Sequence, residues 1–224
     1  MLAQAIVIVL IQVLQKIGVP LNQINDSLFQ LIAGAFAYAL TLFIVIGLPW
    51  FIKKSRTTKE ELGIQRTPKL LDTVWVPAGA VVYLVLTAIV TSVAMSFLTF
   101  VNYDQEQNTG FTNIVQQHEY ILAFLMLVIV APIAEELLFR GYLFGKLRKY
   151  APLWISILIT SLLFAIVHFA WNVGLDVFAL SIVLCLLRVV SGSLWPSIML
   201  HMLKNGVAFY FLFINPTLLS TLGG

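Results

Sequence analysis

The sequence predicts an all-α fold, a polytopic transmembrane helical bundle of about seven membrane segments. Of its 224 residues, 60% are hydrophobic and only 10% are charged, whereas soluble domains carry about 25% charged residues. Apolar runs recur near the length of about 20 residues that a helix needs to cross the hydrocarbon core. The basic residues gather between these runs. A soluble fold could not cover so much apolar surface, so lipid is the expected solvent.

Seven apolar stretches are candidates for membrane helices, and the first and sixth are the weakest by length. The first contains Gln4, Gln12 and Gln15, which suit packing against other helices or a position in the interface. No cleavage-site pattern follows it, so we expect a retained helix and not a removed signal. The expected segments cover residues 2–19, 28–52, 74–100, 120–139, 152–171, 175–190 and 194–214.

Three basic regions fall on one side of the membrane if the seven segments alternate: residues 53–69, residues 146–149 and Arg188. The positive-inside rule assigns that side and the N-terminus to the cytoplasm of a multi-pass cell-membrane protein. This pattern gives no indication of nucleic-acid binding. No linker or repeat is visible, so we expect one integral membrane domain over residues 1–224. Its N-terminal helices would occupy 1–118 and its core helices 119–215.

Ionisable residues inside membrane helices are costly and mark functional sites by default. Glu136 and Arg140 are four residues apart, so they share a helix face and can pair. Glu135 points about 100° away from Glu136, so we expect Arg140 to pair with Glu136 and not with Glu135. His201 and Asn205 are also four residues apart and face one way.

These polar residues are expected to lie at one depth. The fourth and fifth segments join near Ala151, with Glu135 sixteen residues before it and His168 seventeen after it. In an antiparallel hairpin both would lie about 24–26 Å from the turn, near mid-membrane. His201 and Asn205 lie about 10–17 Å into the seventh segment, at comparable depth. One carboxylate, two imidazoles and an amide can therefore converge inside the bundle.

Such a cluster suits hydrolysis. A buried carboxylate with a histidine can take a proton from water, while an amide and a second imidazole can stabilise an oxyanion. Alternatively, a divalent metal such as zinc could be held by Glu135, His168 and His201 and activate the water. The sequence leaves the metal-free and the metal-dependent mechanisms equally open.

Three other residues are assigned no chemistry. Asp176 is expected in a loop or at a helix start. Lys204 is expected to extend to the interface or to pair with a carboxylate. Cys185, the single cysteine, lies in an apolar run and is expected to be a small packing residue.

Three motifs resemble those of the CPBP intramembrane proteases, a family of CAAX proteases and bacteriocin-processing (Abi) proteins. Residues 135–140 resemble its EExxxR motif, residues 164–168 its FxxxH motif and residues 201–205 its HxxxN motif. The three occur in order on successive membrane segments, which makes the combination specific. The resemblance covers about residues 120–214, and Glu61-Leu62-Gly63-Ile64 also looks like a stretch that many members carry.

The resemblance implies an intramembrane endopeptidase that cleaves a membrane-associated peptide or protein. Bacteriocin-like leaders, signalling pro-peptides and lipid-modified termini are candidate substrates. Glu135 and His168 would activate the water, while His201 and Asn205 would stabilise the oxyanion. The remaining motif residues would hold the site together: Glu136 and Arg140.

Two other functional classes stay open at this point. The first is a non-catalytic membrane scaffold or bacteriocin self-immunity factor, which would keep its function after Glu135→Ala. The second is a transporter that uses the cluster as an ion site, although no paired half-helices or repeats are visible. The HExxH, GxSG and GxGD motifs of other intramembrane proteases are absent from the sequence.

Overall fold

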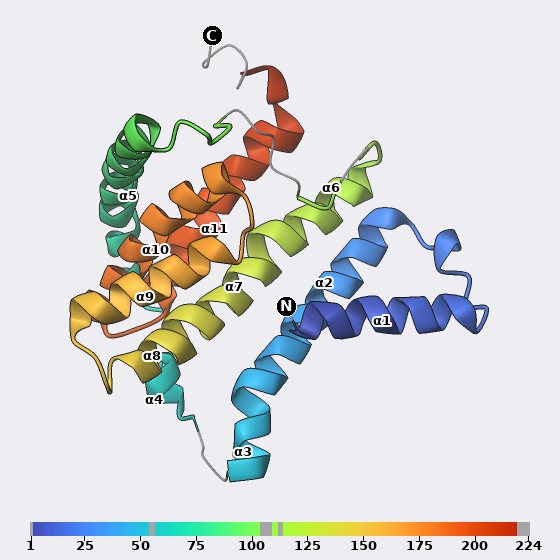
Figure 1. The fold of residues 1–224 in the computed structure, drawn as a ribbon, viewed down its shortest axis with the longest axis horizontal. Coiled ribbons are helices and arrows are strands. Elements are labelled where there is room, and N and C mark those ends of the chain that lie inside the picture. Colours follow the sequence, from blue (N-terminus) through green and yellow to red (C-terminus); the bar gives the residue numbers. More distant parts are fainter. Residues whose placement is uncertain (1, 54–56, 104–108, 112–113, 219–224) are drawn as a thin grey trace. The chain divides into compact units, whose positions relative to one another are not determined.

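The computed structural model describes residues 2–53, 57–103, 109–111 and 114–218, and in these ranges it contains helices and no strand (Figure 1). Among these residues, five helices are long and apolar enough to cross a membrane, and Ala5–Lys16 and Leu153–Ile166 are shorter apolar helices. The predicted all-α membrane fold is therefore confirmed. The five candidate spans are Asp26–Ile52, Leu70–Phe97, Gln117–Leu147, Trp171–Ser191 and Trp195–Ile214.

The fifth and sixth helices differ from the prediction. Helix α9 ends at Ile166 and not at residue 171. Helix α10 covers Trp171–Ser191, 21 residues, so the expectation that the sixth segment is among the shortest is wrong. Between them Phe169 has a φ of 56°, a left-handed conformation that a right-handed helix of L-residues cannot contain. Apart from His168, the residues around this turn are apolar, so hydropathy does not reveal it.

The chain divides into two compact units, which are described separately. The first comprises Met1–Arg56, Asn108–Ala134 and Met202–Gly224, and the second comprises Thr57–Gln107 and Glu135–His201. The expectation of one domain over the whole chain stays a prediction.

In the first unit, α1 (Leu2–Lys16) and α2 (Asp26–Leu42) precede α6 (Gln117–Phe124). Asn25 caps α2 by accepting a hydrogen bond from the Leu28 amide at 3.1 Å. The same side chain donates to Glu119 of α6 at 2.8 Å, which joins the two helix starts. The buried core of this unit consists of Phe111, Ala123, Met126, Val128 and Phe209.

In the second unit, α10 packs against α5 (Leu70–Phe97) and α9 (Leu153–Ile166). Packing and interhelical hydrogen bonds hold such helices together, because lipid tails are as apolar as leucine. Asp176 accepts hydrogen bonds from Tyr83 at 2.5 Å and from Thr87 at 3.0 Å, both on α5. Asp176 lies inside α10, so its predicted place in a loop or at a helix start is wrong. The buried residues of this core are Leu180, Val183, Leu184, Leu187 and Leu200.

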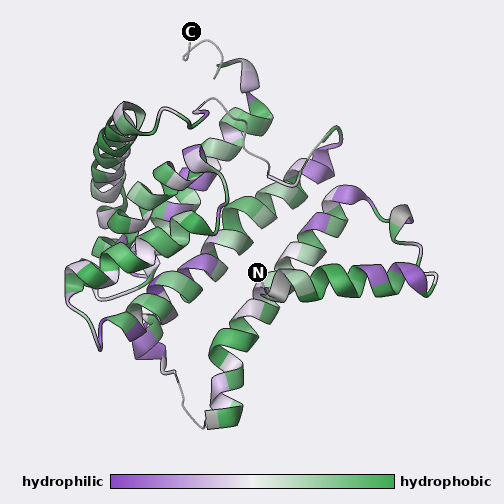
Figure 2. Ribbon diagram, in the orientation of Figure 1, coloured by the Kyte–Doolittle hydropathy of each residue, from purple (hydrophilic) through white to green (hydrophobic). Residues whose placement is uncertain are grey.

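Helix α5 shows the face that such a bundle offers to lipid. Val81, Leu84, Val85 and Ile89 follow one helix face, and each is more than half exposed. Figure 2 shows hydrophobic residues along most of the length of the helices. Cys185 is fully buried beside Phe144 and Ile157, as expected of a packing residue.

Candidate active site

Two adjacent glutamates end helix α7 (Ala131–Glu136), which belongs to the Gln117–Leu147 span. A π-helical stretch, Leu137–Leu143, follows them directly and contains Arg140. The span then returns to α-helix in α8 (Phe144–Leu147). π-Helical turns are rare and often occur at functional sites.

Glu136 and Arg140 form a buried ion pair. Arg140 Nη1 lies 2.8 Å from Glu136 Oε1, and neither side chain is exposed. The contact is the one that the four-residue spacing predicts. Removing two charges from solvent is expensive, so such a pair needs further partners to offset its desolvation.

His201 on α11 (Trp195–Phe209) supplies a further partner. Its Nδ1 lies 2.9 Å from Glu136 Oε1, and its Nε2 lies 3.8 Å from Glu135 Oε2. One imidazole therefore contacts both carboxylates through its two ring nitrogens. The exposed fraction of the Glu135 side chain is 16%, against 0% for Glu136, so Glu135 is the carboxylate that water can reach.

The Phe164 ring is fully buried and contacts Arg140, His168 and His201. The Arg140 guanidinium stacks 4.2 Å above its centroid, in a cation–π contact. His168 and His201 meet it edge-on at centroid distances of 4.9 and 5.9 Å. Sequence reasoning assigned no role to Phe164, although its spacing of four residues from His168 was a usable signal.

His168 lies just beyond the end of α9, and not within a helix as predicted. Its Nδ1 is 2.7 Å from the carbonyl oxygen of Phe164. Since a carbonyl can only accept, Nδ1 carries the proton of this bond, and Nε2 of the neutral ring is left as an acceptor. The strained Phe169 follows directly, and such backbone outliers cluster at functional sites.

Asn205 belongs to the first unit, whereas the other predicted site residues belong to the second. Its Nδ2 donates to the Leu127 carbonyl at 2.9 Å, within the first unit. It lies one helical turn after His201 on α11. Its role at the oxyanion stays a prediction.

The metal alternative requires three ligands close together. Within the ranges that the structure describes, no group of three or more His, Cys, Asp or Glu side chains is arranged to hold a metal ion. Glu135, His168 and His201 therefore do not fit a three-ligand metal site in this arrangement.

A cavity of about 460 Å³ lies between the end of α9 and the start of α10. Its lining is apolar and includes Phe169, Trp171 and Gly174. None of the predicted catalytic residues lines it, so the cavity and the polar cluster are separate features.

Comparisons with known proteins agree with the motifs. Residues 117–207 match the family described as type II CAAX prenyl endopeptidase Rce1-like. This stretch contains all three motifs. No solved structure matches the chain.

Three curated proteins are similar to the chain. The membrane-embedded CAAX protease MroQ of Staphylococcus aureus is 27% identical over 81% of this chain and 72% of its own length. The UPF0177 protein YxdF of Lactococcus lactis is 29% identical over 59% of this chain and 70% of its own length. An uncharacterized 24.3 kDa protein of Escherichia coli is 36% identical over 38% of this chain and 41% of its own length.

Proposed function

Because the chain belongs to the CPBP family of intramembrane proteases, we propose that it hydrolyses a peptide bond in a membrane-associated peptide or protein. The observation that carries this proposal is the position of His201, 2.9 Å from Glu136 and 3.8 Å from Glu135. Carboxylates and an imidazole this close together, in a largely buried setting, are suited to proton transfer.

Glu135 and His168 are the residues that would activate water. Glu135 is the more exposed of the two carboxylates, and His168 has its Nε2 left as an acceptor by the bond from Nδ1 to Phe164. A water molecule held by both would pass one proton to Glu135 while its oxygen attacks the carbonyl carbon. Glu135 would then give that proton to the leaving amine as the peptide bond breaks.

His201 and Asn205 would stabilise the oxyanion. His201 donates through Nδ1 to Glu136, so a proton on Nε2 would make that nitrogen the donor to the substrate oxygen. The Asn205 amide has two N–H groups, of which one is used at Leu127. In this scheme the pair of Glu136 and Arg140 holds the His201 ring in position.

We also propose that the basic loops face the cytoplasm. Glu61 forms ion pairs with Lys146 and Lys149, and Arg188 donates to the Glu60 carbonyl. The three basic regions of the second unit therefore meet at one end of its helices, as alternating segments require.

The proposal is tested with purified full-length protein and a panel of membrane-anchored reporter peptides. Glu135→Gln keeps the size of the side chain but removes its proton-accepting charge. We expect kcat to fall about 10²–10⁴-fold, the usual contribution of general acid–base catalysis. Glu60→Gln, a change at an exposed carboxylate of α4, should leave kcat within about twofold, well inside that range.

Equal cleavage by the Glu135→Gln and Glu60→Gln proteins would refute this role of Glu135. A cellular function that survives Glu135→Gln would instead favour the scaffold or self-immunity hypothesis. A parallel arm with a chelator tests the metal alternative, because only a metal-dependent enzyme should lose activity and regain it on adding zinc.

A further inference from the structure

Residues 58–72 form a segment, here called the strap, that lies at the ends of the helices of the second unit. It begins with α4 (Lys59–Leu62), which Thr58 caps by accepting from the Glu61 amide at 3.2 Å. The Glu61 carboxylate accepts a hydrogen bond from the Thr58 amide at 3.1 Å, which completes a capping box. Gly63 ends the helix with a φ of 77°, a conformation that favours glycine.

The strap contacts the helix that carries the two glutamates. Glu61 lies 3.8 Å from Lys146 and forms a close ion pair with Lys149. On the facing helix, Gly141 and Gly145 leave room for the strap backbone. A Cβ atom at Gly145 would lie 2.9 Å from the Glu61 carbonyl oxygen, and one at Gly141 would lie 3.2 Å from the Leu62 carbonyl oxygen.

This spacing of two glycines is the small-xxx-small pattern that allows close backbone approach in membranes. Here it receives the strap and not a second membrane helix. The first glycine follows Arg140 directly and lies five residues after Glu136. The strap therefore touches the helix directly after Arg140 and within about 7.5 Å of Glu136 along the helix axis.

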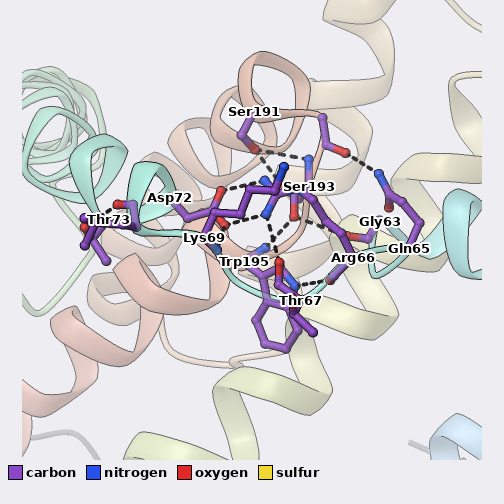
Figure 3. A network of polar contacts seen from close by, with 12 residues as sticks. Gly63, Gln65, Arg66, Thr67, Lys69, Asp72, Thr73, Ser191, Ser193 and Trp195 are labelled. Atoms are coloured by element: carbon purple, nitrogen blue, oxygen red, sulfur yellow. Dashed lines mark hydrogen bonds and ion pairs between the residues drawn. The ribbon is translucent and has the colours of Figure 1, made fainter.

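The strap also holds the start of α11 (Figure 3). The Gly63 carbonyl accepts from the Leu194 amide at 2.8 Å, and Trp195 Nε1 donates to the Arg66 carbonyl at 2.7 Å. The Arg66 guanidinium donates two hydrogen bonds, of 2.6 and 2.7 Å, to the Asp72 carboxylate. Asp72 lies in the first turn of α5, so these bonds join Arg66 to that helix. Trp195 lies six residues before His201, about 9 Å along the helix axis.

From these contacts we infer that the strap is a positioning element, which sets the spacing between the glutamate helix and α11 and so fixes His201 against Glu135 and Glu136. The inference rests on the proposed function, because it assigns a catalytic consequence to that spacing. Gly145 and Trp195 act through other residues in this scheme. They are positioning residues and not catalytic ones.

Three glycine-to-alanine changes give a graded test with a built-in control. The added Cβ meets a backbone carbonyl oxygen at 2.9 Å for Gly145→Ala and at 3.2 Å for Gly141→Ala. For Gly174→Ala it meets the Ala165 carbonyl oxygen at 3.5 Å, an ordinary contact away from the strap. Only the first two changes should displace the strap.

The readouts are kcat, KM and the melting temperature of the purified full-length variants, with the reporter peptides that the unmodified protein cleaves. We expect Gly145→Ala to lower kcat about 10-fold or more with little change in KM, because displacements of about 1 Å can cost 100-fold in rate. The kcat of Gly141→Ala should lie between those of Gly145→Ala and Gly174→Ala. A residue that serves folding alone would change the melting temperature and yield, but not the kcat of folded protein.

Trp195→Phe is the second variant, in case Gly145→Ala does not fold. It keeps an aromatic ring but removes the indole N–H that donates to Arg66 and part of the ring volume, and we expect kcat to fall at nearly constant KM. If the unmodified protein cleaves but the folded variants match Gly174→Ala in kcat, the inference is wrong while the proposed function stands. If the unmodified protein cleaves none of the peptides, the proposed function fails and the inference fails with it.

Discussion

Replacing Arg140 by methionine should destabilise the protein strongly. Removing one partner of a buried ion pair typically costs about 3–5 kcal/mol, because the other charge is left buried and uncompensated. Arg140 and Glu136 are both fully buried and 2.8 Å apart. Methionine keeps an apolar stem of similar length, so the loss should come from charge and not from a cavity.

Two contacts adjust this magnitude. The stacking of Arg140 on Phe164 is lost, and a desolvated cation–π contact contributes up to about 2 kcal/mol. The hydrogen bond between His201 and Glu136 remains and offsets part of the loss. These effects oppose each other, so the expected loss stays within the range of about 3–5 kcal/mol.

The assay is the free energy of unfolding in detergent, compared with Lys146→Met. Lys146 faces Glu61 at 3.8 Å with 32% of its side chain exposed, and exposed ion pairs contribute only about 0–1 kcal/mol. The double variant Arg140→Met with Glu136→Gln should recover much of the lost stability, since it leaves no buried carboxylate charge without its partner. Equal losses for Arg140→Met and Lys146→Met, or a double variant no more stable than the single one, would refute this reasoning.

Two further predictions concern stability. The hydrogen bond from Lys149 holds the pKa of Glu61 below its usual value of 4.5. The contribution of Glu61 to stability is therefore complete above that value and is lost as the pH falls through the lowered pKa. Glu61→Gln should weaken this acid dependence, while Glu60→Gln should preserve it. Tyr83→Phe should cost about 1.5–3 kcal/mol, because Asp176 loses a hydrogen bond. Tyr210→Phe, at a side chain 44% exposed, is its control, and equal melting temperatures would contradict the prediction.

Local spacing predicted the features that depend on one helix. The four-residue spacing of Glu136 and Arg140 predicts a pair on one helix face, and the pair forms although Arg140 lies in the π-helical stretch. The apolar stretches followed in the same way from hydropathy.

Contacts between helices could not be derived from spacing. Whether His201 meets Glu136, and how close it lies to Glu135, depends on helix rotation, which one sequence does not specify. Phe164 joins three of the motif side chains because its helix turns it inward, and hydropathy treats it as any other apolar residue. The turn at Phe169 is a backbone feature without a glycine to mark it.

The π-helical stretch Leu137–Leu143 has a consequence for how this helix can change over evolution. It separates two parts of the helix: the glutamates of the polar cluster lie before it, and Gly145, which contacts the strap, lies after it. Each residue of an α-helix corresponds to about 100° of rotation. A one-residue deletion between Arg140 and Gly145 would therefore turn Gly145 away from its partner while leaving Glu135, Glu136 and Arg140 unchanged. Insertions and deletions in this stretch should be selected against even where substitutions are tolerated.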